Sequence, residues 1–156
     1  MHVRRGTPAD RPFMMGLAGR LAGVADFPWR TPAELEAFQH AFMTEALARP
    51  DTLTLVAEEA DGGPLLGFAA MEPHPDDITG GPGGYLSLLA VTQAAEGRGV
   101  ARALVAAAEE TARQQGWQVL ALDVFATNAR GRRFYDSLGF RAETLRLVKP
   151  LPPAEG

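Results

Sequence analysis

Apolar residues recur along the chain with two different periods, and these periods separate predicted strands from predicted helices. Residues 52–59 alternate between apolar and polar side chains from Leu53 onward, as expected of a half-buried strand. The run from Tyr85 to Val91 is almost continuously apolar, which is typical of a central strand that is buried on both faces. Four further segments are predicted to be strands: residues 1–5, 65–71, 117–125 and 143–148.

Capping residues and helical spacing mark four helices. The sequence Thr31-Pro32-Ala33-Glu34 has a threonine at the N-cap, a proline at the first helical position and a glutamate that completes a capping box. The helix that starts there is predicted to end near Arg49. An Ala-rich helix is predicted over residues 97–115, where Gly116 ends it. Two shorter helices are expected at residues 12–20 and 128–138.

The resulting order, β-α-α-β-β-β-α-β-α-β, alternates strands with helices only in its second half. This order predicts one α/β domain, of the α+β kind, over residues 1–150, in which a mixed sheet carries helices on both faces. Residues 151–156 are expected to form a flexible tail. If only one strand follows Phe140, the sheet exposes an edge, and such an edge favours pairing with a second copy as a homodimer.

The composition is that of an ordinary globular protein and excludes several classes of site. Hydrophobic residues make up 46% of the chain and charged residues 22%. Without cysteine, the chain cannot form disulfides, thiolate zinc sites or a cysteine nucleophile. No apolar stretch approaches the ~18 residues of a membrane span, and the segment from Met1 to Asp10 lacks the apolar run of a signal peptide. We therefore expect a cytoplasmic protein that does not bind membranes.

Charge is distributed unevenly along the chain. Residues 1–96 hold 6 Arg against 13 Asp or Glu, whereas residues 97–146 hold 8 Arg against 5. A basic segment within an acidic protein predicts a local anion site, although a general bias toward arginine explains it equally well. The net charge of −4 and the lack of a basic run of 5–8 residues argue against nucleic-acid binding.

The segment from Gly97 to Ala101 is the most informative part of the sequence. It follows a predicted central strand and opens a long helix, so its backbone amides are expected to be unpaired and to point outward. The positive end of the helix dipole, and glycines that admit a ligand closely, suit a phosphate or pyrophosphate. Arg102 stands where a dinucleotide fingerprint requires glycine, and the Gly-Lys-Ser/Thr of a P-loop is missing. A glycine turn without a ligand is the alternative.

Two motifs in register resemble the GNAT superfamily of N-acetyltransferases. Residues 96–101 resemble its pattern Gln/Arg-x-x-Gly-x-Gly/Ala at Gly99 and Ala101, but Glu96 replaces the leading Gln or Arg. Residues 128–140 resemble its second signature, Asn-x(6)-Tyr-x(3)-Gly-Phe. The resemblance covers residues 85–140, about a third of the chain.

The resemblance implies a sheet of six to seven strands, in which acetyl-CoA lies between two splayed central parallel strands. Those strands would be residues 85–91 and 117–125. Backbone groups of the first strand would bind the pantetheine arm, the glycine turn would bind the pyrophosphate, and Asn128 and Arg132 would add side-chain contacts. The implied cofactor-binding residues are Leu89, Ala90, Val91, Gly97, Arg98, Gly99, Val100, Ala101, Arg102, Asn128, Arg132 and Tyr135.

The resemblance also assigns catalytic roles. Tyr135 would protonate the leaving CoA thiolate, because a phenol with a pKa near 10 can donate to a thiol with a pKa near 8.5. The alternative for Tyr135 is a core aromatic residue beside Phe134. An ammonium acceptor must lose a proton before it attacks, and Glu72 and Asp123 are candidate general bases. Ordered water without a dedicated base is the third option.

The implied reaction is transfer of an acetyl group from acetyl-CoA to an amine of a small molecule or peptide, within a ternary complex. Acidic residues such as Asp26, Glu36 and Asp77 favour a cationic acceptor. No metal is expected, because the prolines of Glu72-Pro73-His74-Pro75 favour a substrate-side loop over a metal site. Two alternatives stay open: a non-catalytic acyl-CoA sensor on the same fold, and an unrelated anion-binding α/β domain.

Overall fold

The computed structural model describes residues 1–154 and contains one mixed sheet of five strands in the order β1-β2-β3-β4-β5. The strands are β1 (His2–Arg5), β2 (Leu53–Glu58), β3 (Leu65–Pro73), β4 (Gly83–Val91) and β5 (Val119–Ala121). The first four strands pair antiparallel with their neighbours, and β5 pairs parallel with β4. The mixed sheet predicted from the alternation pattern is therefore confirmed.

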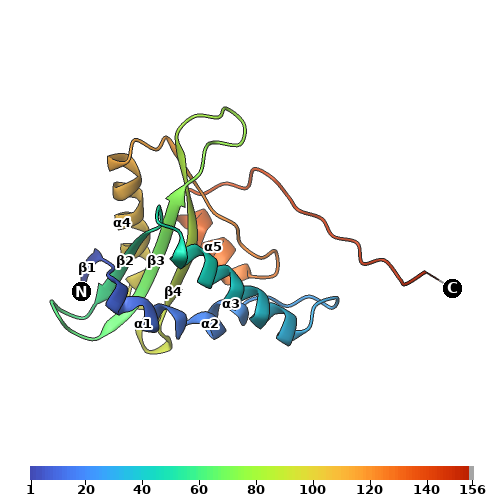
Figure 1. Cartoon of the computed structure of the whole chain (residues 1–156), viewed down its shortest axis with the longest axis horizontal. Helices are drawn as coiled ribbons and strands as arrows, with labels where there is room; N and C mark the ends of the chain where they lie inside the picture. Colours follow the sequence, from blue (N-terminus) through green and yellow to red (C-terminus); the bar gives the residue numbers. More distant parts are fainter. Residues whose placement is uncertain (155–156) are drawn as a thin grey trace.

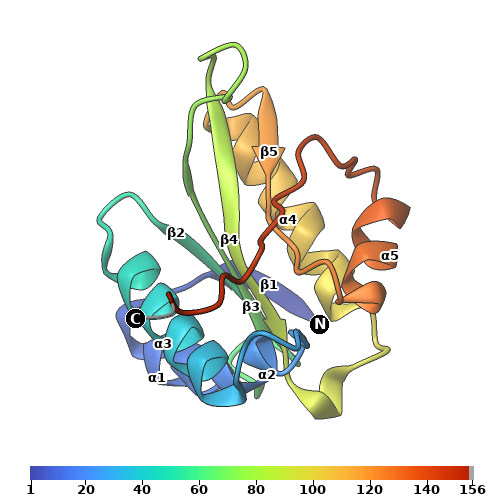
Figure 2. The same cartoon turned by 90° about the vertical axis from the view of Figure 1, so that its right-hand side faces the viewer.

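Helices cover the two faces of the sheet in separate groups (Figures 1 and 2). The N-terminal group consists of a 3₁₀ turn η1 (Pro8–Asp10), α1 (Arg11–Met15), α2 (Ala18–Ala22) and α3 (Pro32–Ala48). The C-terminal group consists of a second 3₁₀ turn η2 (Gln93–Ala95), α4 (Val100–Gln114) and α5 (Ala129–Ser137). Among residues 1–154, no helix is both long and apolar enough to cross a membrane.

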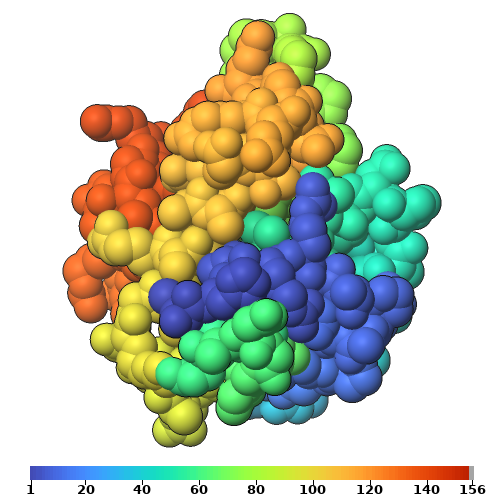
Figure 3. Space-filling view, turned by 90° about the vertical axis from the view of Figure 1, so that its left-hand side faces the viewer, coloured from blue at the N-terminus to red at the C-terminus, as the bar shows by residue number. Residues whose placement is uncertain are grey.

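Each face of the sheet has its own apolar core. On one face Phe68 and Leu88 of the sheet pack with Met43 of α3. On the other face Met71 and Leu86 pack with Leu104 of α4. Neighbouring residues of a strand point to opposite faces, except at a β-bulge such as Ser87, which puts Leu86 and Leu88 on different faces. Figure 3 shows the β1 edge of the sheet, with the N-terminal segment against the β2–β3 turn.

The structure corrects several predicted boundaries. The helix predicted over residues 12–20 is two short helices, α1 and α2, separated by Gly16 and Leu17. The strand predicted over residues 117–125 is paired only from Val119 to Ala121. The strand predicted over residues 143–148 does not form, because this segment has no hydrogen-bonded neighbour among residues 1–154.

The sheet therefore has five strands instead of six to seven. An extended segment becomes a strand only when another strand satisfies its backbone groups, and residues 141–154 leave the body of the protein after Phe140 (Figure 1). The tail expected at residues 151–156 lies partly outside the described residues.

An ion-pair network ties β1 to the first helical turns. Arg4 donates to both carboxylate oxygens of Asp10, at 2.9 and 3.0 Å, and its Nε donates to the buried Glu58 at 3.2 Å. The Asp10 carboxylate also accepts from the Thr7 amide at 2.7 Å. Hydrogen bonds from Arg4 hold the pKa of Asp10 below its ordinary value in spite of burial, which acts in the opposite direction.

Replacing Asp10 with alanine is expected to lower the free energy of unfolding by about 3 kcal/mol, because Arg4 and the Thr7 amide lose a buried partner. The depressed pKa of folded Asp10 means that its contribution is present above pH ~4 and is lost as pH falls through the folded-state value. Urea unfolding at neutral and acidic pH measures both effects. Asp51→Ala, at an exposed carboxylate, is the control, and an equal loss in both variants would contradict this role.

Candidate functional site

The parallel strands β4 and β5 separate partway along their length. Their last paired residues are Tyr85 and Ala121, although β4 continues to Val91. A β-bulge at Ser87 shifts the register between β4 and β3 just beyond that point, and a bulge bends its strand and increases its twist. The edge of β4 from Leu86 to Val91 therefore faces away from β3 without a backbone partner from another strand among residues 1–154. The sequence-predicted splay of two central parallel strands is present.

The turn between β4 and α4 presents unpaired backbone amides. Gly97 and Gly99 have φ angles of +76° and +78°, a backbone conformation that favours glycine. In the described part of the chain, the amides of residues 97–102 have no acceptor, and the Ala103 amide is the first to bond back, to the Gly99 carbonyl. A Cβ atom on either glycine would meet no other atom within 4 Å. The turn is open to an anionic ligand.

Glu96, which departs from the resembled pattern, is neutralised by arginines from two other elements. Arg20 of α2 forms an ion pair with one oxygen of Glu96, and Arg130 of α5 lies 3.6 Å from the other. The Arg20 guanidinium is the main cause of the lowered pKa of Glu96. Arg20 also donates from Nε to the Val91 carbonyl at 2.7 Å. These contacts join α2, the end of β4 and α5 around the glycine turn, and they offset the negative charge beside it.

Other predicted cofactor-binding side chains make contacts within the protein. Arg98 forms a salt bridge of 2.6 Å with Glu59 of the β2–β3 turn. Asn128 is the N-cap of α5 and accepts from the Gly131 amide at 2.9 Å. Arg132 donates to the Ala126 carbonyl at 3.1 Å. Asn128 thus caps α5, while its cofactor contact stays a prediction.

Tyr135 projects from α5 into an aromatic cluster. Its ring packs edge-on against Phe134 and Phe140, with centroid distances of 5.2 and 5.7 Å. The Tyr135 hydroxyl has no hydrogen-bond partner among residues 1–154. Every buried side-chain polar atom in this part of the chain does have a partner, so the Tyr135 hydroxyl is not buried and reaches solvent. Burial of the ring raises the pKa of Tyr135 above its ordinary value, which keeps the phenol protonated. The structure shows both a packing role for the ring and a hydroxyl available to a ligand.

The two candidate bases lie on the α3 face of the sheet, in a row with Tyr85. Glu72 of β3 is the register partner of Tyr85, and Asp123 follows β5 on the same face as Ala121. The Tyr85 hydroxyl donates to Asp123 Oδ2 at 2.5 Å, so it bridges the two strands where they separate. Burial and the Asp123 carboxylate raise the pKa of Tyr85 well above its usual value, so Tyr85 remains a donor.

The two carboxylates differ in their partners. Both oxygens of Glu72 lie 2.9 Å from Arg49 Nη1, and the Glu72 side chain is mostly buried. Asp123 is exposed, and its second oxygen has no partner among residues 1–154.

Sequence reasoning did not find Tyr85, whose only signal is a single phenol at the start of an otherwise apolar strand.

A cavity of about 270 Å³ opens beside the loop between α2 and α3. The charged residues Asp26, Arg30 and Glu36 are among those that line it. Phe27 also lines it and packs edge-on against Phe125, with ring centroids 5.7 Å apart. The cavity therefore adjoins the segment that carries Asp123.

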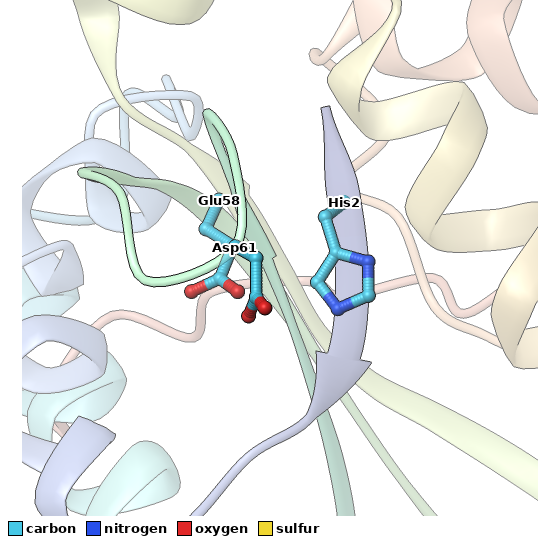
Figure 4. Close-up of side chains that lie close together, drawn as sticks. All are labelled: His2, Glu58 and Asp61. Carbon is cyan, nitrogen blue, oxygen red and sulfur yellow. The ribbon is translucent and has the colours of Figure 1, made fainter.

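A second cluster of ionisable side chains lies at the other end of the sheet. Ligand atoms of His2, Glu58 and Asp61 lie within 4.8 Å of one another (Figure 4). Glu58 already accepts hydrogen bonds from Arg4 and from the Gly62 amide. Because its only buried carboxylate is satisfied by protein donors, this cluster does not indicate a metal site.

Comparison with known proteins identifies relatives over most of the chain. The Acetyltransferase (GNAT) family matches residues 13–140. An aminoglycoside N(6')-acetyltransferase type 1 from Stenotrophomonas maltophilia is 32% identical over 97% of this chain and 95% of its own length. One from Serratia marcescens is 34% identical over 69% of this chain and 75% of its own length. Mycothiol acetyltransferase from Jonesia denitrificans is 37% identical over 63% of this chain, but this match spans only 30% of that protein.

Solved structures share the fold at lower identity. Aminoglycoside antibiotic 6'-N-acetyltransferase from Acinetobacter haemolyticus superposes with a TM-score of 0.67 at 23% identity, covering 99% of this chain and 100% of that one. Ribosomal-protein-alanine N-acetyltransferase from Brucella melitensis superposes with a TM-score of 0.68 at 20% identity, covering 97% and 100%. These likenesses show that the arrangement of sheet and helices is a recurrent one.

Proposed function

The chain belongs to the GNAT family of acetyltransferases, and we propose that it transfers the acetyl group of acetyl-CoA to an amine of a small molecule or peptide by direct attack. The observation that carries this proposal is the coincidence of two features at one end of β4. One is the free edge of β4 beyond Tyr85, and the other is the run of unpaired amides at residues 97–102. Together they offer hydrogen bonds to an extended amide chain and to a diphosphate.

The residues around this edge fit acetyl-CoA as a substrate. The amides of residues 97–102 would bind its pyrophosphate, and Leu89, Ala90 and Val91 would pair with its pantetheine arm. Arg102 and Arg132 carry the positive charge that phosphates require, and Asn128 stands at the start of α5. The family uses acetyl-CoA, and the chemistry of these donors supports its binding here.

Two residues supply the proton transfers of the reaction. The acceptor nitrogen attacks the thioester carbonyl carbon, a C–N bond forms, and the C–S bond breaks. Tyr135 gives its hydroxyl proton to the departing sulfur. Asp123 takes a proton from the attacking amine, because its free oxygen is exposed and its other oxygen is fixed by Tyr85. Glu72 is the weaker candidate, since Arg49 already occupies both of its oxygens.

A cationic small molecule is the acceptor class that the chain supports best. Asp26 and Glu36 line the cavity beside the α2–α3 loop. Asp123 lies two residues before Phe125, whose ring packs against Phe27 of the same lining. Two relatives above 30% identity are aminoglycoside N(6')-acetyltransferases, and an aminoglycoside is a small molecule that carries several amino groups. We propose that the acceptor is an aminoglycoside-like compound or a polyamine, and not the N-terminus of a protein.

Isothermal titration with acetyl-CoA, followed by an amine panel monitored through release of free CoA thiol, tests the proposal. The chain is expected to bind acetyl-CoA and to release thiol fastest with aminoglycosides or polyamines. Binding without thiol release for any amine would indicate a sensor instead of an enzyme. Lack of binding at millimolar acetyl-CoA would reject both functions.

Gly99→Val is expected to raise the KM of acetyl-CoA roughly 10–100-fold, because a β-branched residue is strained at φ +78° and shifts the amides that follow. Gly62→Val is a matched control, since Gly62 has φ +75° and equally open space but lies in the β2–β3 turn. Steady-state kinetics of both variants measure the difference. An equal change in KM for the two would show that strain alone, and not the position of the turn, affects acetyl-CoA.

A further inference from the structure

Two arginines from distant parts of the sequence meet at one carboxylate just before the glycine turn. The carboxylate belongs to Glu96, which immediately precedes the unpaired amides of residues 97–102. Arg20 of α2 pairs with one of its oxygens, and Arg130 of α5 lies 3.6 Å from the other. Figure 2 shows α2 beside the turn that joins β4 to α4. Two cations around one anion leave an excess of one positive charge beside these amides.

Arg20 is the more firmly held of the two arginines. Its Nε donates to the Val91 carbonyl at 2.7 Å, and its Nη2 pairs with Glu96. Its side chain is 35% exposed, whereas that of Arg130 is 74% exposed. Because two of its nitrogen atoms are anchored, the plane of the Arg20 guanidinium is fixed. Val91 is the last residue of β4, so this guanidinium lies where the free edge of β4 meets the glycine turn.

Arg20 keeps hydrogen-bond donors that the protein does not use. A guanidinium carries five N–H groups. In the described part of the chain, Arg20 donates only to the Val91 carbonyl and to Glu96. A planar cation with free donors, next to a run of unpaired amides, suits a phosphate oxygen. Glu96 itself cannot attract a phosphate, and it stands where the resembled pattern has Gln or Arg. A cation at this place comes from α2 instead.

We propose that Arg20 is a further acetyl-CoA-binding residue, which donates to the diphosphate held at residues 97–102 while Glu96 keeps its guanidinium in place. Arg20 lies in the N-terminal group of helices, outside both sequence motifs, so neither motif reveals it. It supplies from α2 the positive charge that Glu96 removes from the turn. This inference rests on the proposed acetyl-CoA function, and its tests measure binding without turnover.

Isothermal titration with acetyl-CoA tests the role of Arg20. Arg20→Ala is expected to raise the Kd of acetyl-CoA roughly 10–100-fold, because a charge-assisted hydrogen bond is lost and the Glu96 carboxylate loses its main partner. Arg113→Ala is the matched control and should keep the wild-type Kd, since Arg113 is also ion-paired but lies in the last turn of α4. A wild-type chain that does not bind acetyl-CoA would reject the proposed function itself. Wild-type affinity in Arg20→Ala would reject only the role of Arg20.

A Glu96→Gln background separates contact with the diphosphate from neutralisation of Glu96. If Arg20 contacts the diphosphate, Arg20→Ala/Glu96→Gln should bind acetyl-CoA at least about fivefold more weakly than Glu96→Gln alone. Equal Kd values for these two chains would show that Arg20 only neutralises Glu96, and would overturn the proposal.

Arg20→Gln/Glu96→Gln tests whether the charge of Arg20 or its contact with the end of β4 matters. The glutamine amide can still donate to the Val91 carbonyl, so this variant preserves that link between α2 and β4. It is expected to bind acetyl-CoA as weakly as Arg20→Ala/Glu96→Gln does, because it carries no positive charge. Affinity equal to that of Glu96→Gln alone would assign the effect to the Val91 contact, and the proposed contact between Arg20 and the diphosphate would be wrong.

Discussion

Tyr135→Phe is expected to lower kcat for acetyl transfer by about 10²–10⁴-fold, the range of a lost general acid, while the KM of acetyl-CoA stays nearly unchanged. The phenylalanine ring keeps the contacts of Tyr135 with Phe134 and Phe140, so packing and folding are preserved. What is lost is a hydroxyl that reaches solvent and has no partner among residues 1–154. Steady-state kinetics with a saturating amine acceptor measure the effect.

The pH dependence gives an independent check on Tyr135. Burial raises its pKa above the ordinary value of a phenol, so the phenol stays protonated at neutral and mildly alkaline pH. The wild-type rate should therefore show no loss from this ionisation in that pH range. Phe134→Leu is the control, because it disturbs the same aromatic cluster but keeps the Tyr135 hydroxyl. It should lower kcat much less than Tyr135→Phe does. Should Tyr135→Phe retain full turnover, the ring would have only the packing role that the aromatic cluster already shows.

Features that depend on neighbouring residues in the sequence could be predicted. Gly97 and Gly99 adopt the left-handed conformation because the chain must turn sharply between β4 and α4, and a glycine-containing turn before a long helix predicts this. Asn128 caps α5 through a hydrogen bond three residues ahead. The interaction range in both cases is a few residues, so the sequence pattern contains all the information needed.

Features that depend on distant residues could not be predicted. The bulge at Ser87 belongs to the pairing of β4 with β3, and β5 pairs with β4 only as far as Tyr85, just before the bulge. Tyr85 and Asp123 are 38 residues apart, and only the parallel pairing of β4 with β5 brings them into contact. The alternation at residues 143–148 predicted a strand that does not form, because a pattern within one segment does not show whether a partner is present.

Asp123→Asn is expected to lower kcat/KM for the amine by about 10²–10⁴-fold at neutral pH, because the side chain can no longer accept a proton from the acceptor. The substitution conserves size, and its carbonyl oxygen can still accept from the Tyr85 hydroxyl, so the link between β4 and β5 is retained. Glu72→Gln is the matched control on the same face of the sheet. It should change the rate only several-fold, since Arg49 already holds both Glu72 oxygens.

The pH profile separates a base from a positioning residue. At low pH, kcat/KM falls when the base of the enzyme is protonated, and this fall is the acidic limb of the pH profile. If Asp123 accepts the proton, the acidic limb disappears in Asp123→Asn. The remaining rate then follows the fraction of unprotonated amine. Tyr85→Phe removes the hydrogen bond that fixes Asp123 but leaves the carboxylate, so it should reduce the rate and keep the acidic limb. An unchanged rate and limb in Asp123→Asn, with loss of both in Glu72→Gln, would assign the base to Glu72 instead. If neither variant loses rate or limb, neither Asp123 nor Glu72 is the base, and the proposed role of Asp123 is wrong.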